Sequence, residues 1–395
     1  MAFAKVYNKE VYSMQMITKK EISFEKVSKI FKIPYILLRA SNPQLNSKTI
    51  KEKSAITIPG FILSKKGYSL TNKEIDECFH LGNGNGKKAQ FPKRVTDFIV
   101  DDITNYDSQK MYQNLYKLIA IYPFLKQKSI GNTVLTKPIV EIRIGTGTYK
   151  THINAAFHGN EWITSAALMK CINKYALLLM EGNKLLLKTF DNHRLSIVPM
   201  VNPDGVDLVI HGKSAAKYYQ KEVLKINNNN EDFSRWKANI RGVDLNKQFP
   251  AKWDEEVKRK PKSPHYRDYP GAIPFSEPET IAMKQLVENQ HFYRVHALHT
   301  QGEEIYWGFA SLEPSNAKSI AIQYANKTGY EAVQFVDNFA GFKDWFIQTY
   351  RKPGFTIELG KGTNPLPIQQ FSQIFQKTWE IFYTNLTLNN EHLNS

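Results

Sequence analysis

The chain contains 395 residues, of which 42% are hydrophobic and 12% are aromatic. This length exceeds the roughly 250–300 residues that one hydrophobic core usually organises, so we expect one large domain with a smaller unit attached. The formal net charge of +16 favours anionic partners. Lys and Arg are spread along the chain, however, and no zinc-finger, helix-turn-helix or RNA-binding signature is present. Both observations argue against nucleic acid as the partner.

The first residues, Met1–Met16, include three charged residues and lack an apolar run of signal-peptide length. No segment reaches the ~18 uncharged apolar residues that a membrane span needs. The two cysteines, Cys78 and Cys171, are too few and too far apart for a disulfide framework. We therefore expect a cytoplasmic protein without a membrane span, and association with the cell wall remains open.

Residues 11–60 predict a small βααβ unit. A strand-like segment, Val11–Ile17, precedes a helix in which apolar residues of Phe24–Phe31 recur at three- and four-residue spacing. Pro34 ends this helix, because proline cannot continue one. A second helix, Tyr35–Ser41, is followed by a strand and turn at Ile56–Gly60.

This order resembles a LysM module, a small domain that binds N-acetylglucosamine-containing glycans such as peptidoglycan. The resemblance rests on Phe24–Phe31, Leu37–Pro43 and Ile56–Gly60, and it implies glycan binding by residues 1–60. The usual Gly-Asp-Thr-Leu start of the first helix is replaced by Lys20–Phe24. A packing domain without a ligand therefore remains an alternative.

The sequence of residues 61–104 indicates either a linker or a degenerate second LysM-like module. Phe61–Leu81 resembles an eroded copy of the first module, and the Gly- and Asn-rich stretch Gly82–Lys88 is turn or linker material. We place the boundary of the main domain, residues 105–395, near Asp101–Asn105.

The sequence pattern of the main domain predicts an α/β fold. Helices at Ser108–Ala120 and Trp162–Met180 alternate with strands at Val140–Ile144, His152–Phe157 and Leu195–Val201. Strands that alternate with helices indicate a sheet that is covered by helices on both faces. Functional sites in such sheets gather at the strand ends.

A His-x-x-Glu motif stands at one such strand end. His158 and Glu161 follow an apolar strand and precede an apolar helix, so both side chains can face one point. A third candidate ligand, His299, ends the predicted strand Arg294–Leu298. Two imidazoles and a carboxylate leave the fourth position of a catalytic zinc ion to water. Glu358 lies inside an apolar strand, where a carboxylate is costly unless it has partners or a catalytic role.

The order His-x-x-Glu, Asn-Pro-Asp-Gly, Gly-Val-Asp-x-Asn, strand-His and strand-Glu resembles the carboxypeptidase A-type zinc peptidases. Within them it is most similar to the bacterial γ-D-glutamyl-L-diamino-acid endopeptidases, which cut peptidoglycan stem peptides before the diamino acid, often meso-diaminopimelate. The resemblance implies a mixed sheet of the eight-stranded type and one zinc ion per chain. It implies that His158, Glu161 and His299 bind zinc and that Glu358 is the general base.

Several positions depart from the carboxypeptidase pattern. The arginine that stabilises the oxyanion is replaced by Lys237, and Arg241 is an alternative for that role. Asn246 matches the asparagine that holds the substrate's terminal carboxylate, but the arginine beside it is Lys247. The position of the mobile tyrosine falls near Val336, so no phenol caps the site. Lysine cannot clamp a carboxylate bidentately, so these changes favour an endopeptidase over a carboxypeptidase.

Lys343 matches the position at the base of the pocket for the side chain after the cut. A lysine there predicts a carboxylate-bearing side chain such as that of meso-diaminopimelate; the alternative is that Lys343 points to solvent. Three functions are compatible with these patterns. The first is a zinc endopeptidase of peptidoglycan turnover or sporulation; the others are an ordinary metallocarboxypeptidase and a glycan-binding protein with an inactive peptidase domain.

Overall fold

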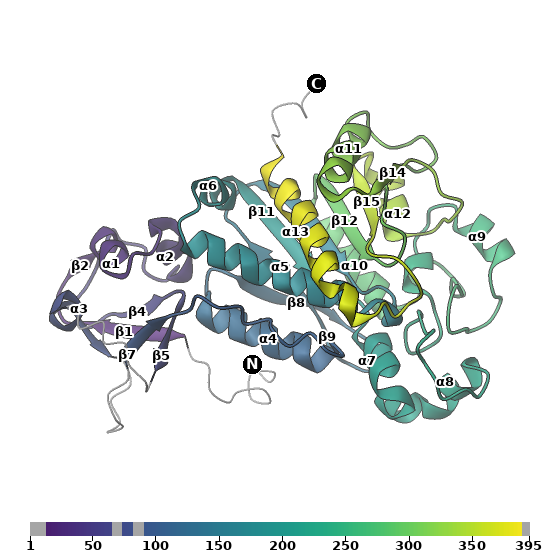
Figure 1. The fold of residues 1–395 in the computed structure, drawn as a ribbon, viewed down its shortest axis with the longest axis horizontal. Coiled ribbons are helices and arrows are strands. Elements are labelled where there is room, and N and C mark those ends of the chain that lie inside the picture. Colours follow the sequence, from purple (N-terminus) through teal and green to yellow (C-terminus); the bar gives the residue numbers. More distant parts are fainter. Residues whose placement is uncertain (1–12, 65–72, 82–90, 389–395) are drawn as a thin grey trace.

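The computed structural model describes residues 13–64, 73–81 and 91–388. A small N-terminal unit stands at one end of an elongated molecule, and a large α/β domain forms the rest (Figure 1). The Gly-rich stretch Gly82–Lys88, interpreted above as a linker, lies outside the described residues.

The N-terminal unit contains the predicted strand, two helices and strand, and two further short strands, Ile22–Ser23 and Thr49–Ile50, flank the pair of helices. Its first strand, Met14–Thr18, pairs antiparallel with Ala55–Ile58, with Met16 opposite Ile56. Ser23 caps the first helix by accepting a hydrogen bond from the backbone N–H of Lys26. The elements of the unit are β1 (Met14–Thr18), β2 (Ile22–Ser23), α1 (Phe24–Phe31), α2 (Tyr35–Ser41), β3 (Thr49–Ile50), β4 (Ala55–Ile58), β5 (Phe61–Ser64), α3 (Lys73–Cys78), β6 (Phe79–Leu81) and β7 (Phe91–Arg94).

The segment interpreted as a linker or second module contributes to the same unit. Strand β6 pairs with β1 to give a three-stranded sheet in the order β4-β1-β6, and β5 pairs with β7. The division of the chain at residues 60 and 104 remains a prediction.

The main domain contains a mixed eight-stranded sheet in the order β14-β13-β15-β12-β10-β11-β9-β8. Its centre is parallel, whereas β8, β9 and the pairing of β13 with β15 are antiparallel. The predicted fold is therefore confirmed. The strands are β8 (Lys126–Asn132), β9 (Pro138–Ile144), β10 (Tyr149–Ala155), β11 (His193–Val198), β12 (Arg294–His299), β13 (Glu304–Tyr306), β14 (Glu331–Val333) and β15 (Gly354–Glu358).

Helices cover both faces of this sheet. One apolar core joins α4, α5 and α13 to one face, and a second joins α10 and α12 to the other. The helices are α4 (Ser108–Ile121), α5 (Ile163–Met180), α6 (Lys184–Asn192), α7 (Pro203–His211), α8 (Gln220–Ile226), α9 (Trp253–Arg259), α10 (Pro278–Gln290), α11 (Ala317–Thr328), α12 (Phe342–Tyr350) and α13 (Phe371–Thr387), with 3-10 turns η2 (Gly159–Glu161), η3 (Gly212–Tyr219), η4 (Leu245–Lys247) and η5 (Ile368–Gln370).

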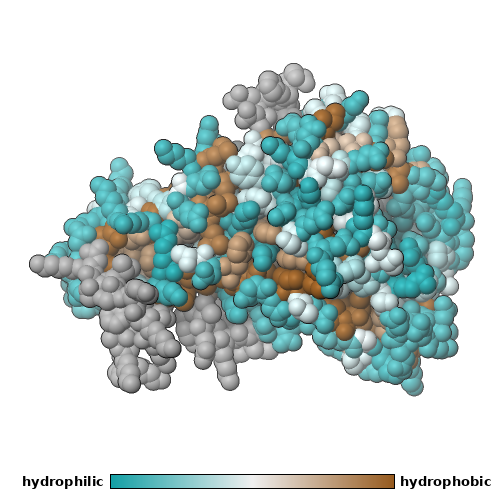
Figure 2. Space-filling model, viewed as in Figure 1, coloured by the Kyte–Doolittle hydropathy of each residue, from teal (hydrophilic) through white to brown (hydrophobic). Residues whose placement is uncertain are grey.

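Helix α5 is long and apolar enough to cross a membrane by length and composition, but 83% of it is buried inside the protein, as expected of a core helix. Figure 2 shows apolar side chains near α4 along the middle of one face, whereas the end that carries α8 and α9 is hydrophilic. Both cysteines, Cys78 and Cys171, are buried and unpaired.

Candidate metal centre and active site

The metal motif occupies a strand-to-helix corner. Strand β10 ends at Ala155, Ala156 has a φ of +52°, and the 3-10 turn η2 leads directly into α5. The hydroxyl of Thr164 accepts a hydrogen bond from the N–H of Ala156 and donates one to the carbonyl of Glu161. Gly159 lies so close to Gly205 that a Cβ would come within 2.5 Å of its carbonyl oxygen. This packing directs His158 and Glu161 to the same point.

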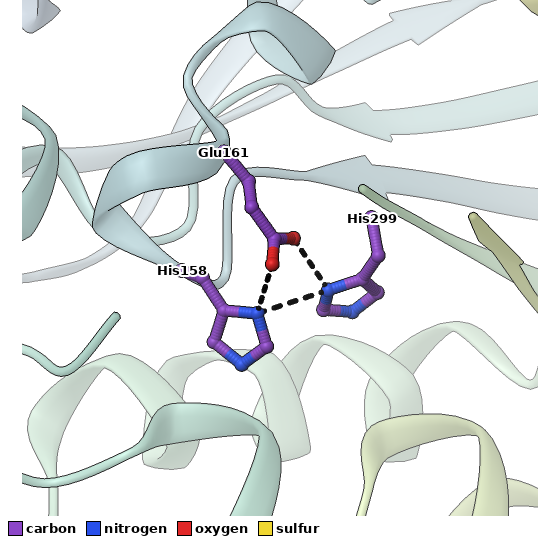
Figure 3. A group of neighbouring side chains, drawn as sticks. All are labelled: His158, Glu161 and His299. Atoms are coloured by element: carbon purple, nitrogen blue, oxygen red, sulfur yellow. Dashed lines mark hydrogen bonds and ion pairs between the residues drawn. The ribbon is translucent and has the colours of Figure 1, made fainter. Parts of the chain in front are cut away.

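His299, the last residue of β12, brings the third donor to that point. Figure 3 shows the two imidazoles and the carboxylate facing one another. His158 Nδ1 lies 2.8 Å from Glu161 Oε1, His299 Nδ1 lies 2.9 Å from Glu161 Oε2, and the two Nδ1 atoms are 3.2 Å apart. All three residues are buried.

This donor set fits one zinc ion. Zinc bonds of about 2.1 Å in tetrahedral geometry separate the donor atoms by about 3.4 Å, close to the observed spacings. The other nitrogen of His158, Nε2, lies 3.0 Å from Asp244 Oδ1, which leaves Nδ1 for a metal. Burial alone would lower the pKa of His158, but the carboxylates of Glu161 and Asp244 outweigh it and raise that pKa to about 9. The electrostatics therefore favour a cation where the three donors meet.

Other polar groups hold Glu161 in place. The N–H of Thr300 donates to Glu161 Oε2 at 3.2 Å, and the amide of Asn364 lies 3.5 Å from Oε1. The sequence analysis did not single out Asp244, Thr300 or Asn364 as site residues. Asp244 could have been found, because it lies within the Gly-Val-Asp-x-Asn motif.

Glu358 ends the strand next to His299. The two residues are register partners in the parallel pair β12–β15, so their side chains leave the same face of the sheet. Burial, reinforced by the neighbouring carboxylate of Glu161, raises the pKa of Glu358 to about 8. The structure thus places this carboxylate beside the three metal donors.

Lys237, and not Arg241, lies at this centre. Its ammonium is 3.2 Å from Glu161 Oε1 and largely buried. Burial lowers its pKa, but the charges of Glu161, Asp244 and Glu358 outweigh burial and raise it. Arg241 is 45% exposed and lies 3.5 Å from Glu277 instead. Of the two candidate oxyanion donors, the structure brings only Lys237 to the candidate metal site.

Hydrogen bonds to its backbone carbonyls fix the loop that carries Lys237. Trp236 is fully buried, and its indole N–H donates to the carbonyl of Ala238 at 2.9 Å. The N–H of Gly159 donates to the carbonyl of Lys237 at 3.0 Å. This bond ties the loop directly to the metal corner.

Strand β13 adds two polar groups that the sequence analysis missed. Glu304 is the antiparallel register partner of Glu358, and Tyr306 is that of Thr356. Opposed residues leave the same face of a sheet, so Glu304 and Tyr306 extend the surface that carries Glu358. The phenol of Tyr306 donates to Glu304. A phenol therefore stands beside the site although Val336 supplies none.

The residues matched to carboxylate binding are engaged elsewhere. Asn246 accepts a hydrogen bond from the N–H of Phe342 at 3.0 Å, which connects η4 to α12. The ammonium of Lys247 is buried and bonds to Glu256 and Asn338. The structure does not direct Lys247 toward the metal donors, and a substrate-binding role for it remains a prediction.

Lys343 is buried and does not point to solvent. Its ammonium donates to the carbonyl of Gly308 at 2.6 Å and pairs with Asp344 at 2.6 Å. It lines a cavity of about 310 Å³. The described residues around this cavity are Lys252, Gly308, Phe309, Ala310, Phe335, Val336, Asp337, Phe339, Lys343 and Asp344, and none of the three metal donors is among them.

Comparison with known proteins identifies the family. Residues 111–381, more than half of the chain, match the description of zinc carboxypeptidases. The chain belongs to the zinc carboxypeptidase family. Zinc dependence is a property of this family, and the three buried donors can hold the metal.

Two bacterial relatives cover nearly the whole chain. Gamma-D-glutamyl-L-diamino acid endopeptidase 1 of Lysinibacillus sphaericus is 41% identical over 384 residues, which cover 91% of this chain and 96% of that protein. The uncharacterized protein YqgT of Bacillus subtilis (strain 168) is 39% identical over 370 residues, which cover 91% and 94%.

Solved structures of zinc carboxypeptidases share the fold. Bovine thrombin-activatable fibrinolysis inhibitor, in complex with tick carboxypeptidase inhibitor, superimposes with a TM-score of 0.57 at 18% identity and covers 71% of this chain and 96% of its own. Carboxypeptidase A from Helicoverpa armigera gives 0.55 at 20% identity and covers 71% and 73%.

Proposed function

We propose that this zinc carboxypeptidase family member hydrolyses the γ-D-glutamyl bond to a diamino acid, such as meso-diaminopimelate, in peptidoglycan stem peptides. The geometry that supports the chemistry is the placement of Glu358 beside the converging donors of His158, Glu161 and His299. The substrate class is supported by the 41% identical relative, which is named for this reaction and matched over 96% of its length.

In the proposed mechanism, His158, Glu161 and His299 would hold a zinc ion, which would supply a Lewis acid that lowers the pKa of a water molecule and polarises the scissile carbonyl. Glu358 accepts the proton of the attacking water and passes it to the leaving amine of the diamino acid. The ammonium of Lys237, held at the centre by Glu161, donates to the oxygen on which negative charge develops. Asp244 keeps His158 in the tautomer that leaves Nδ1 free for the metal.

We infer substrate recognition from the residues that replace the carboxylate-binding residues of carboxypeptidases. Because the charge of Lys247 is balanced by Glu256, this position offers little to a free C-terminus. That arrangement supports an endopeptidase over an ordinary carboxypeptidase. We assign Asn246 to substrate binding. Lys343 is also paired, with Asp344, but unlike Lys247 it lines a cavity, so we propose that it meets an acidic side chain after the cut. The cytoplasmic location and a role in turnover or sporulation are further parts of the proposal.

Glycan binding by the N-terminal unit is a second part of the proposal. It is supported by the βααβ order, with β1 paired antiparallel to β4. Co-sedimentation of the full chain with insoluble peptidoglycan, with cellulose as the control polymer, tests it. Equal retention by both polymers would leave the unit as a packing domain.

The peptidase activity is tested with L-Ala-γ-D-Glu-meso-diaminopimelate and mass spectrometry. We expect release of L-Ala-D-Glu, loss of turnover on chelation, and recovery with zinc. A tripeptide in which only the C-terminal α-carboxylate of diaminopimelate is amidated, with the side-chain carboxylate left free, separates the two peptidase types, because an endopeptidase still cleaves it. Absence of L-Ala-D-Glu from the zinc-loaded protein would refute the assigned bond.

A further inference from the structure

A second hollow, of about 290 Å³, lies at the opposite end of the sheet from the metal donors. Arg194 on its wall is the register partner of Lys150, near the start of β10, whereas His158 follows the end of β10. At ~3.3 Å per strand residue, the two sites are roughly 20 Å apart. The described residues that line the hollow are Lys126, Arg143, Gly145, Thr146 and Arg194, of which three are cationic and none is acidic.

The sheet register directs the three cations to one face. Lys126 on β8 lies directly opposite Arg143 on β9. Arg143 in turn lies opposite Ser196 on β11, and Arg194 precedes Ser196 by two residues. Because strand side chains alternate with a period of two, all three leave the same side of three adjacent strands. Like charges that face one another in this way destabilise a sheet.

Protein groups satisfy these cations only in part. The ammonium of Lys126 donates to the carbonyl of Pro123 at 2.8 Å, and Arg194 donates to that of Thr146 at 3.3 Å. Both acceptors are neutral. Arg143 Nε is buried and has no hydrogen-bond partner among the residues that the structure describes.

Among the described residues, Glu141 is the carboxylate that forms an ion pair with the trio. Its Oε2 lies 3.7 Å from Arg143 Nε, beyond hydrogen-bond reach. Its Oε1 accepts the hydroxyl hydrogen of Ser196 at 2.8 Å. Glu141 therefore offsets one of three positive charges and leaves donor N–H groups on the wall of the hollow.

We propose that this hollow is a binding site for a phosphate-class oxyanion, either free phosphate or a phosphate carried by a polyol or sugar. Two guanidinium groups offer paired N–H donors to the oxygens of a tetrahedral anion, and Lys126 adds a point charge. A dianion balances the excess positive charge, whereas a single carboxylate leaves part of it. Nothing in this site depends on the peptidase chemistry.

Isothermal titration calorimetry of the zinc-loaded full chain with inorganic phosphate tests the proposal, with acetate at matched ionic strength as the comparison anion. We expect a 1:1 site for phosphate with acetate at least about tenfold weaker. The double variant R143Q/R194Q loses two charge-assisted donors, so its phosphate affinity should fall by about tenfold or more. The single variant K126Q should fall less but measurably.

The charge-matched control is K221Q/K225Q, which removes two exposed cations from α8. It should bind phosphate as the wild type does, and both double variants should keep wild-type turnover of the stem peptide. Equal weakening in the two double variants, or no weakening in R143Q/R194Q and K126Q, would show only nonspecific attraction or binding at the metal and would overturn the site.

Glycerol 3-phosphate distinguishes the two sources of the anion. Binding at least about tenfold tighter than that of inorganic phosphate, lost in R143Q/R194Q, identifies a phosphate carried on a polyol. Equal or weaker binding that still depends on Arg143 and Arg194 identifies free phosphate. Acetate binding as tight as phosphate would overturn the proposed ligand class.

Discussion

Glu358 differs from the other carboxylate at the active centre in what surrounds it. Glu161 is fully buried and is held by two imidazoles, by the ammonium of Lys237 and by the N–H of Thr300. Glu358 has no ion pair or hydrogen bond among the described contacts, and its pKa is raised to about 8 by burial and by Glu161. A carboxylate that holds metal and a carboxylate that exchanges protons require these opposite environments.

The variant E358Q tests this difference. It keeps the shape of the side chain but removes the proton acceptor, so turnover of the stem peptide should fall by about 10²–10⁴-fold. Zinc content by elemental analysis and the melting temperature should stay at wild-type values, because Glu358 is not one of the three donors. Loss of zinc together with activity would assign Glu358 to metal binding instead.

The placement of Lys237 and Arg241 leads to a second comparison. K237Q should lower kcat by about 10²–10³-fold, the cost of losing one oxyanion donor. R241Q removes a half-exposed charge that pairs with Glu277 and should change kcat by less than about threefold. Steady-state kinetics of both variants decide between them. A large loss in R241Q with little loss in K237Q would reverse the assignment.

The sequence predicted the meeting of His158, Glu161 and His299 from spacing and strand ends, and the structure brings them together. It did not predict Asp244, Glu304 or their contacts. Asp244 reaches His158 across 86 positions, and Glu304 meets Glu358 only through the register of β13 with β15. Such contacts depend on how loops bring distant segments together, and the periodicity of a single sequence does not encode this.

At the scale of elements, buried carboxylates hold the β8–β9 hairpin against two helices. Asp204 of α7 accepts the N–H of Leu135, and Glu279 of α10 accepts that of Val134. Asn239 connects this cluster to the loop of Lys237 by donating to Glu279 at 3.3 Å. These hydrogen bonds therefore fix the turn of the β8–β9 hairpin, which lies at the edge of the sheet.

Glu279 makes stability depend on pH. Burial, assisted by Asp204 and Glu277, raises its pKa from 4.5 to about 8. Between these two pKa values the folded chain keeps a proton on Glu279 that the unfolded chain releases. The contribution of this proton to the free energy of unfolding is therefore complete below pH 4.5 and is lost as the pH rises through about 8, at up to about 1.4 kcal/mol per pH unit. E279Q should flatten the fall in free energy between about pH 5 and about pH 9, measured by urea unfolding.

The control for this prediction is E288Q, which changes an exposed glutamate on the same helix. It should leave the pH dependence as in the wild type. A wild-type slope in E279Q, or an equal flattening in E288Q, would contradict the role of the buried carboxyl.

Long apolar elements are predicted well by the sequence, and edge elements are not. Helix α5 was expected at Trp162–Met180 and spans Ile163–Met180. Strand β8 was not predicted, because Lys126–Asn132 is mostly exposed and lacks alternating apolar residues. The order of the strands was also beyond reach, since it depends on crossovers that local patterns do not encode.

At the scale of the whole molecule, the N-terminal unit packs firmly on the ends of α4 and α5. The N–H of Gly60 donates to the carbonyl of Ile121 at 2.7 Å, and Arg94 donates to that of Met180. The apolar core on this face runs without a break from the N-terminal unit into the main domain. We infer that the two parts unfold as one cooperative unit.

Gly60 and Gly182 offer a matched test of this coupling. Both have positive φ, +75° and +84°, so alanine at either position costs about 1–2 kcal/mol of backbone strain. A Cβ on Gly60 would also come within 2.5 Å of Met180 Cε, whereas a Cβ on Gly182 meets no atom of the described residues within 4 Å. G60A should therefore be less stable than G182A by about 1–3 kcal/mol of overpacking at the contact, less whatever Met180 can relieve by moving.

Tryptophan fluorescence makes the measurement selective. All six tryptophans lie at position 162 or later, so their emission reports unfolding of the main domain alone. If the parts are coupled, the substitution at Gly60 lowers the urea midpoint seen by tryptophan, and circular dichroism follows the same transition. A tryptophan midpoint unchanged from the wild type, with a separate earlier loss of circular dichroism, would show that the N-terminal unit unfolds independently. In that case the docking contacts hold the unit in place without adding to the stability of the peptidase domain.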